Sequence, residues 1–257
     1  MSGRRTDRCG VYYHSAEHMR EVDNGAATLV IASPPFTNRL DCVTLDKQEY
    51  LDFIRRVFRE VLRMLRSGGI LVVINTDLRD HARYNRASRA FDGLVWHKHS
   101  DIRVIADELG FRCVDTKIWA KSLKRNSYRY TFAYIQFFEK PRDPLQWMVR
   151  KTKDPAFAAD VWLLEGGTTR RNPCGNLFRD AIHPEIVRRC LTQFTSPGDL
   201  VVSPFTGSGT ILSVATSMGR RSIGYEVNRK LRPLISDSIE APQKFYAYRR
   251  LLEPLRD

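Results

Sequence analysis

The chain of 257 residues is poor in long apolar runs. A helix that spans a bilayer needs about 20 predominantly apolar residues, and no stretch of even about 18 occurs here. We therefore expect no membrane span. The N-terminus continues into a polar segment where a secretory signal would have an apolar one, so we expect no such signal either.

Cysteine is scarce as well. The five cysteines are an odd number, are scattered along the chain and form no C-x-x-C pair. This argues against a disulfide framework and a structural zinc site, and it predicts a reducing compartment, the cytoplasm. We interpret His97-Lys-His99, which has no clear acid or thiol partner, as part of a surface loop and expect no metal site.

Acidic residues are too few to balance the basic ones. The chain has 29 Asp and Glu against 42 Lys and Arg, which gives a net charge of +13. A chain this basic indicates a polyanionic partner, although net charge says nothing about fold. A merely well-solvated surface is the alternative.

The chain does have a regular alternation of apolar strands and amphipathic helices. Gly68-Gly69 are expected to end the first helix, and Ser100 or Asp101 to begin the second. Strands are predicted over residues 27–32, 70–74, 113–120, 130–138, 200–203 and 222–225, and helices over 46–66, 102–109, 184–194 and 210–218. This order predicts an α/β protein with a largely parallel sheet.

A glycine-rich loop follows the strand at 200–203, with the sequence Ser203-Pro-Phe-Thr-Gly-Ser-Gly-Thr210. Gly207 and Gly209 would let the backbone approach a ligand, and the helix that follows presents free N–H groups. Glu226 lies 17 residues beyond Gly209, at the end of the next strand, where an acid accepts hydrogen bonds from ribose hydroxyls. The loop therefore predicts a nucleoside-bearing ligand, with a plain strand-to-helix turn as the alternative.

Ser33-Pro-Pro-Phe36 ends the strand at 27–32. Consecutive prolines cannot continue a central strand, so the chain must leave the sheet there. Ligands of open α/β sheets bind at the carboxyl ends of the strands, where Ser33 would offer a hydroxyl and Phe36 an aromatic face. A structural strand ending is the alternative.

Together the two motifs resemble the S-adenosylmethionine-dependent amino-methyltransferases of DNA. The Ser-first tetrapeptide is similar to the form usual for cytosine-N4 methylation, whereas an Asp-first form is usual for adenine-N6. The catalytic motif precedes the cofactor loop, which is the permuted beta arrangement of that family. The likeness covers nearly the whole chain and includes residues 67–73, 118–121, 183–185 and 196–199.

The resemblance implies a Rossmann-like methyltransferase fold, a mostly parallel twisted sheet with helices on both faces. It implies S-adenosyl-L-methionine as cofactor and a catalytic tetrapeptide of Ser33, Pro34, Pro35 and Phe36. The implied cofactor-binding residues are Ser15, His183, Ser203, Phe205, Thr206, Gly207, Ser208, Gly209, Thr210 and Glu226. Ser15 and Ser203 stand where the family usually has an acid, so an inactive nucleic-acid-binding relative stays an alternative, as does RNA as the substrate.

A basic stretch follows the catalytic half. Residues 120–153 contain nine Lys and Arg and two acids, with aromatic residues between them, which suits contacts with DNA phosphates; a solvated face is the alternative. Phe132 and Tyr134 are expected in the core. The candidate DNA contacts are Lys121, Lys124, Arg125, Arg129, Arg150, Lys151, Arg170 and Arg171.

From about residue 140 to 181, prolines and glycines interrupt the alternation, and we interpret this part as an insertion and not as sheet scaffold. The predicted organisation is a catalytic half over 1–140, a small target-recognition segment over 141–180 and a cofactor-binding half over 181–257. Pro173-Cys174 lies in the insertion and not after a strand, so cytosine-C5 chemistry is disfavoured.

The expected activity is site-specific methylation of a flipped cytosine at N4 in double-stranded DNA, with adenine-N6 as the alternative. A cognate restriction endonuclease is a candidate partner. The choice between monomer and dimer stays open, and the target sequence does not follow from composition.

Overall fold

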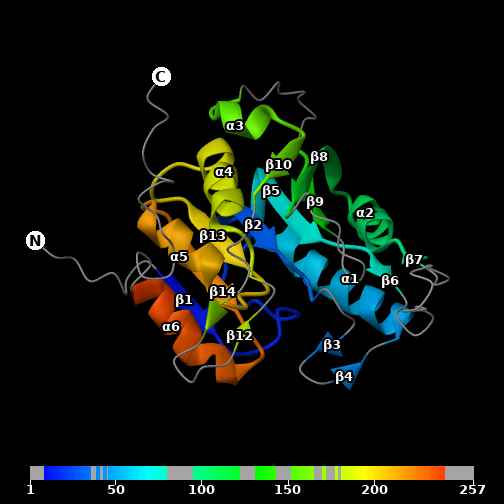
Figure 1. Ribbon diagram of the computed structural model, residues 1–257, viewed down its shortest axis with the longest axis horizontal. Helices are drawn as coiled ribbons and strands as arrows, with labels where there is room; N and C mark the ends of the chain where they lie inside the picture. Colours follow the sequence, from blue (N-terminus) through cyan, green and yellow to red (C-terminus); the bar gives the residue numbers. More distant parts are fainter. Residues whose placement is uncertain are drawn as a thin grey trace, which may run out of the picture.

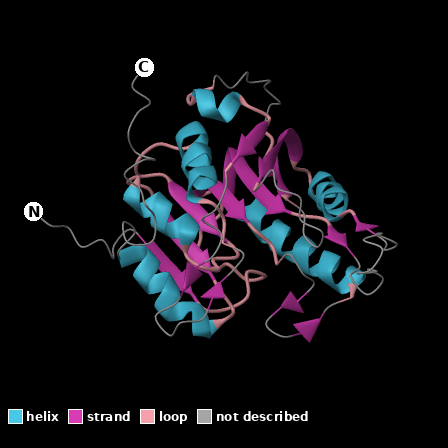
Figure 2. Ribbon diagram, viewed as in Figure 1, coloured by secondary structure: helices cyan, strands magenta, loops and turns pink. Residues whose placement is uncertain are grey.

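An eight-stranded sheet runs through the molecule, with the strand order β1-β14-β13-β2-β5-β9-β8-β10 (Figures 1 and 2). Its strands are β1 (Cys9–Tyr12), β2 (Ala27–Ala32), β5 (Leu65–Asn75), β8 (Arg112–Ala120), β9 (Phe132–Glu139), β10 (Val161–Leu163), β13 (Leu200–Ser203) and β14 (Arg221–Tyr225). The computed structural model describes residues 9–35, 39–40, 43–44, 46–79, 95–121, 131–142, 152–164, 170–171, 177–178 and 181–240.

The remaining elements connect or cover this sheet. The helices are α1 (Lys47–Met64), α2 (Lys98–Glu108), α3 (Pro155–Ala158), α4 (Pro184–Phe194), α5 (Thr210–Ser217), the 3-10 helix Arg229–Leu231 and α6 (Arg232–Glu240). Three two-stranded pairs are formed by β3 (Arg39–Leu40) with β4 (Val43–Thr44), β6 (Leu78–Arg79) with β7 (Val95–Trp96), and β11 (Arg170–Arg171) with β12 (Leu177–Phe178). None of the helices in the described ranges is long and apolar enough to cross a membrane.

All neighbouring strands of the large sheet pair in parallel except β9, which is antiparallel to both β5 and β8. The carboxyl ends of β2, β13 and β14 therefore lie at one edge of the sheet. The carboxyl ends of β5 and β8 lie at the same edge, together with the beginning of β9. This edge holds both motifs singled out in the sequence.

Two apolar cores lie on opposite faces of the sheet. Val30 and Ala32 of β2 pack in one core with residues of α1 and α2. Leu29 and Ile31, the alternate residues of the same strand, pack in the other core with residues of α3, α4 and α5. This alternation is what a central strand requires when helices cover both faces. The predicted α/β fold with a mostly parallel sheet is confirmed.

Helix α1 ends earlier than predicted. Asp46 caps its N-terminus in a capping box with Glu49, as its sequence favours. The C-terminus is at Met64, because the Nζ of Lys140 binds the carbonyl oxygens of Leu62 and Leu65 at 2.7 and 2.8 Å. A side chain from the end of β9 thus satisfies carbonyls that a glycine cap would otherwise address, and Gly68-Gly69 lie inside β5.

The beginning of α2 also differs from the prediction. The helix begins at Lys98 with His97 as its N-cap, and neither Ser100 nor Asp101 caps it. The backbone N–H of His99 instead donates to the carboxylate of Asp77 at 3.3 Å. A distant acid therefore supplies the cap that a local residue was expected to supply.

The segment predicted to be a pure insertion contributes to the scaffold. Val161–Leu163 forms β10, which pairs in parallel with Ile118–Ala120 of β8 at the edge of the sheet. Phe157 of α3 and Trp162 of β10 are buried in the same core as α4. The interpretation of residues 140–181 as lying outside the sheet is wrong for this edge strand.

Candidate active site

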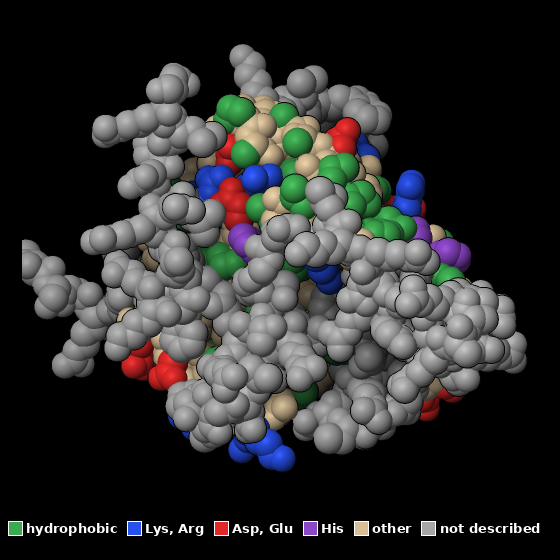
Figure 3. All heavy atoms as spheres, viewed as in Figure 1, with side chains coloured by type: hydrophobic (Ala, Val, Ile, Leu, Met, Phe, Trp, Pro, Cys, Tyr) green, Lys and Arg blue, Asp and Glu red, His purple; other side chains and the backbone are tan. Residues whose placement is uncertain are grey.

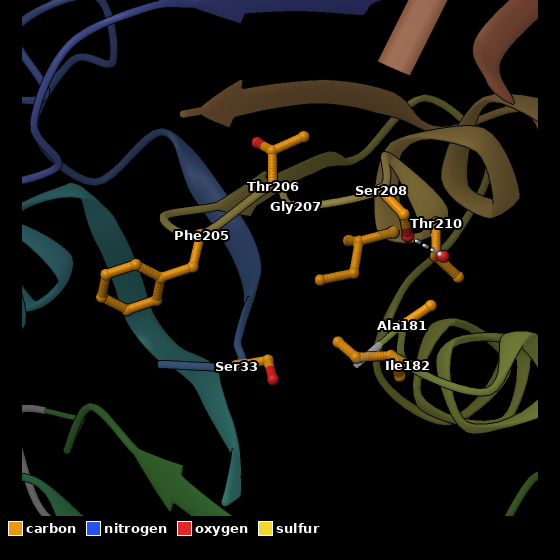
Figure 4. A pocket seen from close by; sticks show the side chains of 9 residues that line it. Ser33, Ala181, Ile182, Phe205, Thr206, Gly207, Ser208 and Thr210 are labelled. Atoms are coloured by element: carbon orange, nitrogen blue, oxygen red, sulfur yellow. Dashed lines mark hydrogen bonds between the residues drawn. The ribbon is translucent and has the colours of Figure 1, made fainter. Parts of the chain in front are cut away.

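Ser33 and the glycine-rich loop line one cavity at the carboxyl edge of the sheet. Ser33 follows β2 directly, and the loop from Phe205 to Thr210 follows β13, which pairs with β2. In Figure 4 the Ser33 hydroxyl lies across the cavity from the loop, and Phe205 lies beside it. The lining residues are Ser33, Ala181, Ile182, Phe205, Thr206, Gly207, Ser208, Thr210 and Ile211. Residues far apart in the sequence thus come together as predicted.

The loop is held open by its glycines and by its own hydrogen bonds. Gly207 and Gly209 have φ angles of 55° and 81°, which glycine adopts without strain. Gly209 is the N-cap of α5, and a Cβ there would lie 3.3 Å from the Cα of Ile235 in α6. Its smallness therefore serves the contact with α6, and Gly209 is not among the cavity residues. Ser208 and Thr210 hydrogen-bond each other at 2.9 Å.

Glu226 is fixed at the end of β14, next to the loop. One carboxylate oxygen accepts the backbone N–H of Gly207 at 2.8 Å, and the other accepts that of Asn228 at 2.9 Å. Its own N–H donates to the carbonyl of Tyr12 in β1 at 3.0 Å. A carboxylate oxygen has more than one acceptor site, so both remain able to accept a hydroxyl. The position suits the predicted contact with a ribose.

Three predicted cofactor residues lie outside the cavity lining. His183 caps α4, since its Nδ1 accepts the N–H of Glu185 at 3.2 Å. The hydroxyl of Ser15 donates to Glu17 at 2.9 Å. Ser203 is fully buried, and its hydroxyl has no hydrogen-bond partner among the described residues. Roles for these three in cofactor binding stay predictions.

The acid missing at Ser15 is present two residues later. Glu17 accepts the Ser15 hydroxyl and pairs with Arg56 of α1. Partial burial raises the pKa of Glu17, but the hydrogen bonds from Arg56 and Ser15 outweigh it, so the pKa is lowered and the carboxylate stays charged. Negative charge is therefore retained near the carboxyl end of β1.

The catalytic tetrapeptide is described for its first three residues, and Phe36 lies outside the described range. Ser33 is half-buried and Pro34 is buried. The carbonyl oxygen of Pro35 accepts hydrogen bonds from the Nζ of Lys98 at 2.9 Å and the hydroxyl of Tyr50 at 3.2 Å. The motif is therefore fixed from behind by α1 and α2.

Lys98 and its surroundings were missed in the sequence. The residue is 1% exposed and occupies the buried face of α2 with Ile102, Ile105 and Ala106. The signal was available, because a lysine at position 98 continues the apolar spacing of residues 102 and 105. Burial lowers the pKa of Lys98 from 10.5 to about 7, and the charge of Asp77 opposes that shift.

Asp77, His97 and His99 form a cluster beside Lys98, which corrects the predicted surface loop. Three potential ligand atoms of these residues lie within 4.8 Å of one another. The Nδ1 atoms of His97 and His99 lie 3.2 and 2.6 Å from the two carboxylate oxygens of Asp77, which are hydrogen-bond distances. A divalent cation would add positive charge next to the Lys98 ammonium, so we regard the cluster as hydrogen-bonded. The absence of a metal stays a prediction.

The aromatic residues at the start of β9 belong to this cluster and not to the apolar cores. Phe132 and Tyr134 are half-buried, which contradicts the prediction of core positions. Tyr134 stacks on His99 with ring centroids 4.0 Å apart, and Phe132 packs edge-on to Tyr134. Polar rings at the sheet edge explain why these side chains stay partly exposed.

Of the predicted DNA contacts, only Lys121 has a described side chain. It follows β8, and its Nζ lies 4.8 Å from the ring centroid of Trp119. The side chains of Lys124, Arg125, Arg129, Arg150, Lys151, Arg170 and Arg171 lie outside the described residues. On the face shown in Figure 3, Lys and Arg side chains of the described residues lie at separate places, with acids close to several of them.

Comparison with known proteins supports the chemistry of this site. Residues 27–237 match the N6_N4_Mtase family, described as DNA methylase. The chain is 26% identical over 288 residues to the Type II methyltransferase M.MjaI of Methanocaldococcus jannaschii, covering 91% of this chain and 92% of the relative.

Solved structures give the same result. A DNA modification methylase of Thermus thermophilus, TTHA0409, complexed with S-adenosyl-L-methionine, has a TM-score of 0.69 and 26% identity, covering 90% of this chain and 92% of the other. The cytosine-N4-specific PvuII DNA methyltransferase has a TM-score of 0.71 at 17% identity, covering 94% and 92%, and shows the fold alone.

The chain belongs to the N6/N4 family of DNA methylases. It is a DNA methyltransferase with a Rossmann-like fold, and its cofactor is S-adenosyl-L-methionine. The site fits that cofactor, because a loop of positive-φ glycines and a prepositioned acid adjoin the cavity that Ser33 enters.

Proposed function

We propose that the chain transfers a methyl group to the exocyclic N4 of a flipped cytosine in double-stranded DNA. The observation that carries the proposal is the placement of Ser33 in the cavity of the cofactor loop. A serine hydroxyl accepts a hydrogen bond without bringing a charge to the target base. The Ser-first tetrapeptide resembles the cytosine-N4 form, and this resemblance supports cytosine over adenine.

The reaction asks two things of the protein. An exocyclic amino nitrogen is a weak nucleophile, because its lone pair is delocalised into the ring. The Ser33 Oγ and the Pro34 carbonyl would accept the two amino hydrogens, which favours a pyramidal nitrogen with its lone pair available. The bound cofactor supplies an electrophilic methyl group on a sulfonium. The protein's contribution is positioning and electrostatics, with no covalent enzyme intermediate.

Contacts with DNA complete the proposal. The target base must leave the duplex stack to reach Ser33, and Phe36 would stack on it. Lys121 follows the carboxyl end of β8 and so lies at the same sheet edge as Ser33. It would contact phosphate with the basic residues predicted after it. Residues 141–180 would supply target recognition between the catalytic and cofactor halves.

The biological setting follows from the relatives. M.MjaI is a Type II methyltransferase, a class that acts in restriction–modification. We therefore include a cognate restriction endonuclease as a partner and the cytoplasm as the place of action. The relatives leave the number of subunits, one or two, as part of the test.

The test is mass spectrometry of nucleosides from the DNA of a host that expresses the chain and lacks its own N4 and N6 methylation. N4-methylcytosine is the expected product, and it should be absent when Ser33→Ala is expressed at the same level. N6-methyladenine would keep the enzyme class and overturn the specificity. No modified base, with folded protein and available cofactor, would favour the inactive binder, and methylated RNA would change the substrate.

A further inference from the structure

The Pro35 carbonyl is bound by two side chains from outside the catalytic segment. Lys98 of α2 donates at 2.9 Å and Tyr50 of α1 at 3.2 Å. Pro34 and Pro35 both have a fixed φ, so the peptide units of this segment have few rotations left. The orientation of the Pro35 carbonyl is therefore passed on to the Pro34 carbonyl and to Ser33, one and two residues earlier.

The ammonium of Lys98 sits where an apolar group would pack more simply. Its Nζ lies 4.3 Å from the ring centroid of Tyr50 and 5.6 Å from that of Trp96. Burying an ammonium costs free energy unless it is paired, and methionine or leucine would continue the apolar stripe of α2 without that cost. The aromatic faces and the Pro35 carbonyl compensate the charge at this position.

Asp77 ties this ammonium to the centre of the sheet. The carboxylate is 7% exposed and follows β5, which pairs in parallel with β2. It binds the N–H and the ring nitrogen of His99 and balances the charge of Lys98. The donor to Pro35 is thus fixed relative to the strand that ends in Ser33.

We propose that Lys98 is a positioning residue for methyl transfer: through the Pro35 carbonyl it orients the Pro34 carbonyl and the Ser33 hydroxyl toward the target amine. The inference rests on the proposed function, because Ser33 and Pro34 are the acceptors assigned there. Lys98 itself touches the backbone of the motif and not the reacting atoms. Its effect should therefore fall on the rate of transfer and not on cofactor binding.

The experiment compares Lys98→Met with Lys47→Met in the full chain. Lys47 is a matched control, because its Nζ also lies 5.6 Å from the Trp96 ring centroid but pairs with Asp101 and does not bind Pro35. The measurements are the single-turnover rate on methylatable DNA and the dissociation constants of DNA and S-adenosyl-L-methionine. Misplacing a reacting group by about 1 Å costs up to about 100-fold in rate, so we expect a fall of about 10- to 100-fold for Lys98→Met. Both dissociation constants should stay within about threefold, and Lys47→Met should match the wild type.

Tyr50→Phe provides a second variant that keeps the fold. It removes one hydroxyl and leaves the ring, so the Pro35 carbonyl loses a donor at little cost in packing. We expect a severalfold lower transfer rate, and a combined effect with Lys98→Met that is not the product of the two single effects. If Lys98→Met does not fold, the rate of Tyr50→Phe decides.

The pH dependence separates positioning from packing. An ammonium is the stronger donor, so the wild-type single-turnover rate should fall as pH rises past about 7, and Lys98→Met should lose this limb. Tyr50 and Lys47 of α1, Asp77 after β5 and His97, His99 and Asp101 at the start of α2 remain in that variant, so loss of the limb identifies Lys98.

Wild-type transfer rates in Lys98→Met or Tyr50→Phe would overturn the inference and leave the proposed function intact. A loss of cofactor affinity equal to the loss of rate would also overturn it. A wild-type chain that methylates no base overturns the proposed function, and this inference with it.

Discussion

Gly207 and Glu226 are joined by a hydrogen bond of 2.8 Å, from the backbone N–H of the loop to the carboxylate at the end of β14. The second carboxylate oxygen of Glu226 accepts the N–H of Asn228 at 2.9 Å. The acid is thus oriented by two backbone donors and needs little rearrangement to meet a ligand. The cofactor loop and the acid form one preorganised unit, although 19 residues separate them.

Replacement of Glu226 tests this unit. Glu226→Ala removes the acceptor for a ribose hydroxyl and leaves the Gly207 N–H without its acceptor. Loss of one or two hydrogen bonds to a charged group should raise the dissociation constant of S-adenosyl-L-methionine about 10- to 100-fold. Titration calorimetry measures it, with Glu240→Ala at the exposed end of α6 as control. An unchanged constant would remove Glu226 from the cofactor site.

The packing under the loop predicts a stability effect at Gly224. A Cβ on this residue of β14 would contact the Thr206 hydroxyl and lie 2.6 Å from a methyl carbon of Leu212. Overpacking of this kind costs about 1–3 kcal/mol, so Gly224→Ala should lower the free energy of unfolding by that amount. Gly10→Ala in β1 is the matched control, because the new Cβ would meet its nearest neighbour at 3.6 Å. Equal urea midpoints for the two variants would contradict the prediction.

Two buried serines should respond in opposite directions. The Ser203 hydroxyl has no hydrogen-bond partner in the described part of the chain, whereas the Ser213 hydroxyl donates to the carbonyl of Ser238 at 2.6 Å. A buried unpaired hydroxyl costs about 1–3 kcal/mol. Without cofactor, Ser203→Ala should therefore raise the free energy of unfolding by about 1 kcal/mol, and Ser213→Ala should lower it. Destabilisation of both variants to the same extent would show that Ser203 has a partner.

The buried lysine predicts a pH-dependent stability. The folded-state pKa of Lys98 is about 7, against 10.5 as its ordinary value, so between these pH values the unfolded chain binds a proton that the folded chain does not. The contribution of Lys98 to the free energy of unfolding therefore rises with pH in this window, by up to about 1.4 kcal/mol per pH unit, and is flat below it. The difference in unfolding free energy between wild type and Lys98→Met, measured from about pH 6 to about pH 9, should follow this curve. A difference independent of pH would show that Lys98 is not desolvated.

Local patterns sufficed where the sequence contains its own partners. The strand before Ser33, the helix Pro184–Phe194 and the strand before the glycine-rich loop lie where they were predicted. Each is an apolar run or an amphipathic segment bounded by proline, glycine or a capping residue. The meeting of Ser33 with the loop also followed, because the carboxyl ends of parallel strands share one edge.

Prediction failed where distant residues replace local ones. The end of α1 depends on Lys140, the start of α2 depends on Asp77, and β10 gains its place by pairing with β8. None of these contacts leaves a mark within its own segment. Lys98 differs from them, because its position on an apolar stripe is visible in the sequence and only its partner, Pro35, is not.

The most direct test of the central claim is single-turnover methyl transfer by the purified chain, with labelled S-adenosyl-L-methionine and unmethylated genomic DNA. Wild type should place the label on N4 of cytosine, and Ser33→Ala should react at least about 100-fold more slowly, the cost of losing one preorganised group in the transition state, while it binds the cofactor as before. Equal rates in the two proteins would contradict the assignment of Ser33 and of the site built around it.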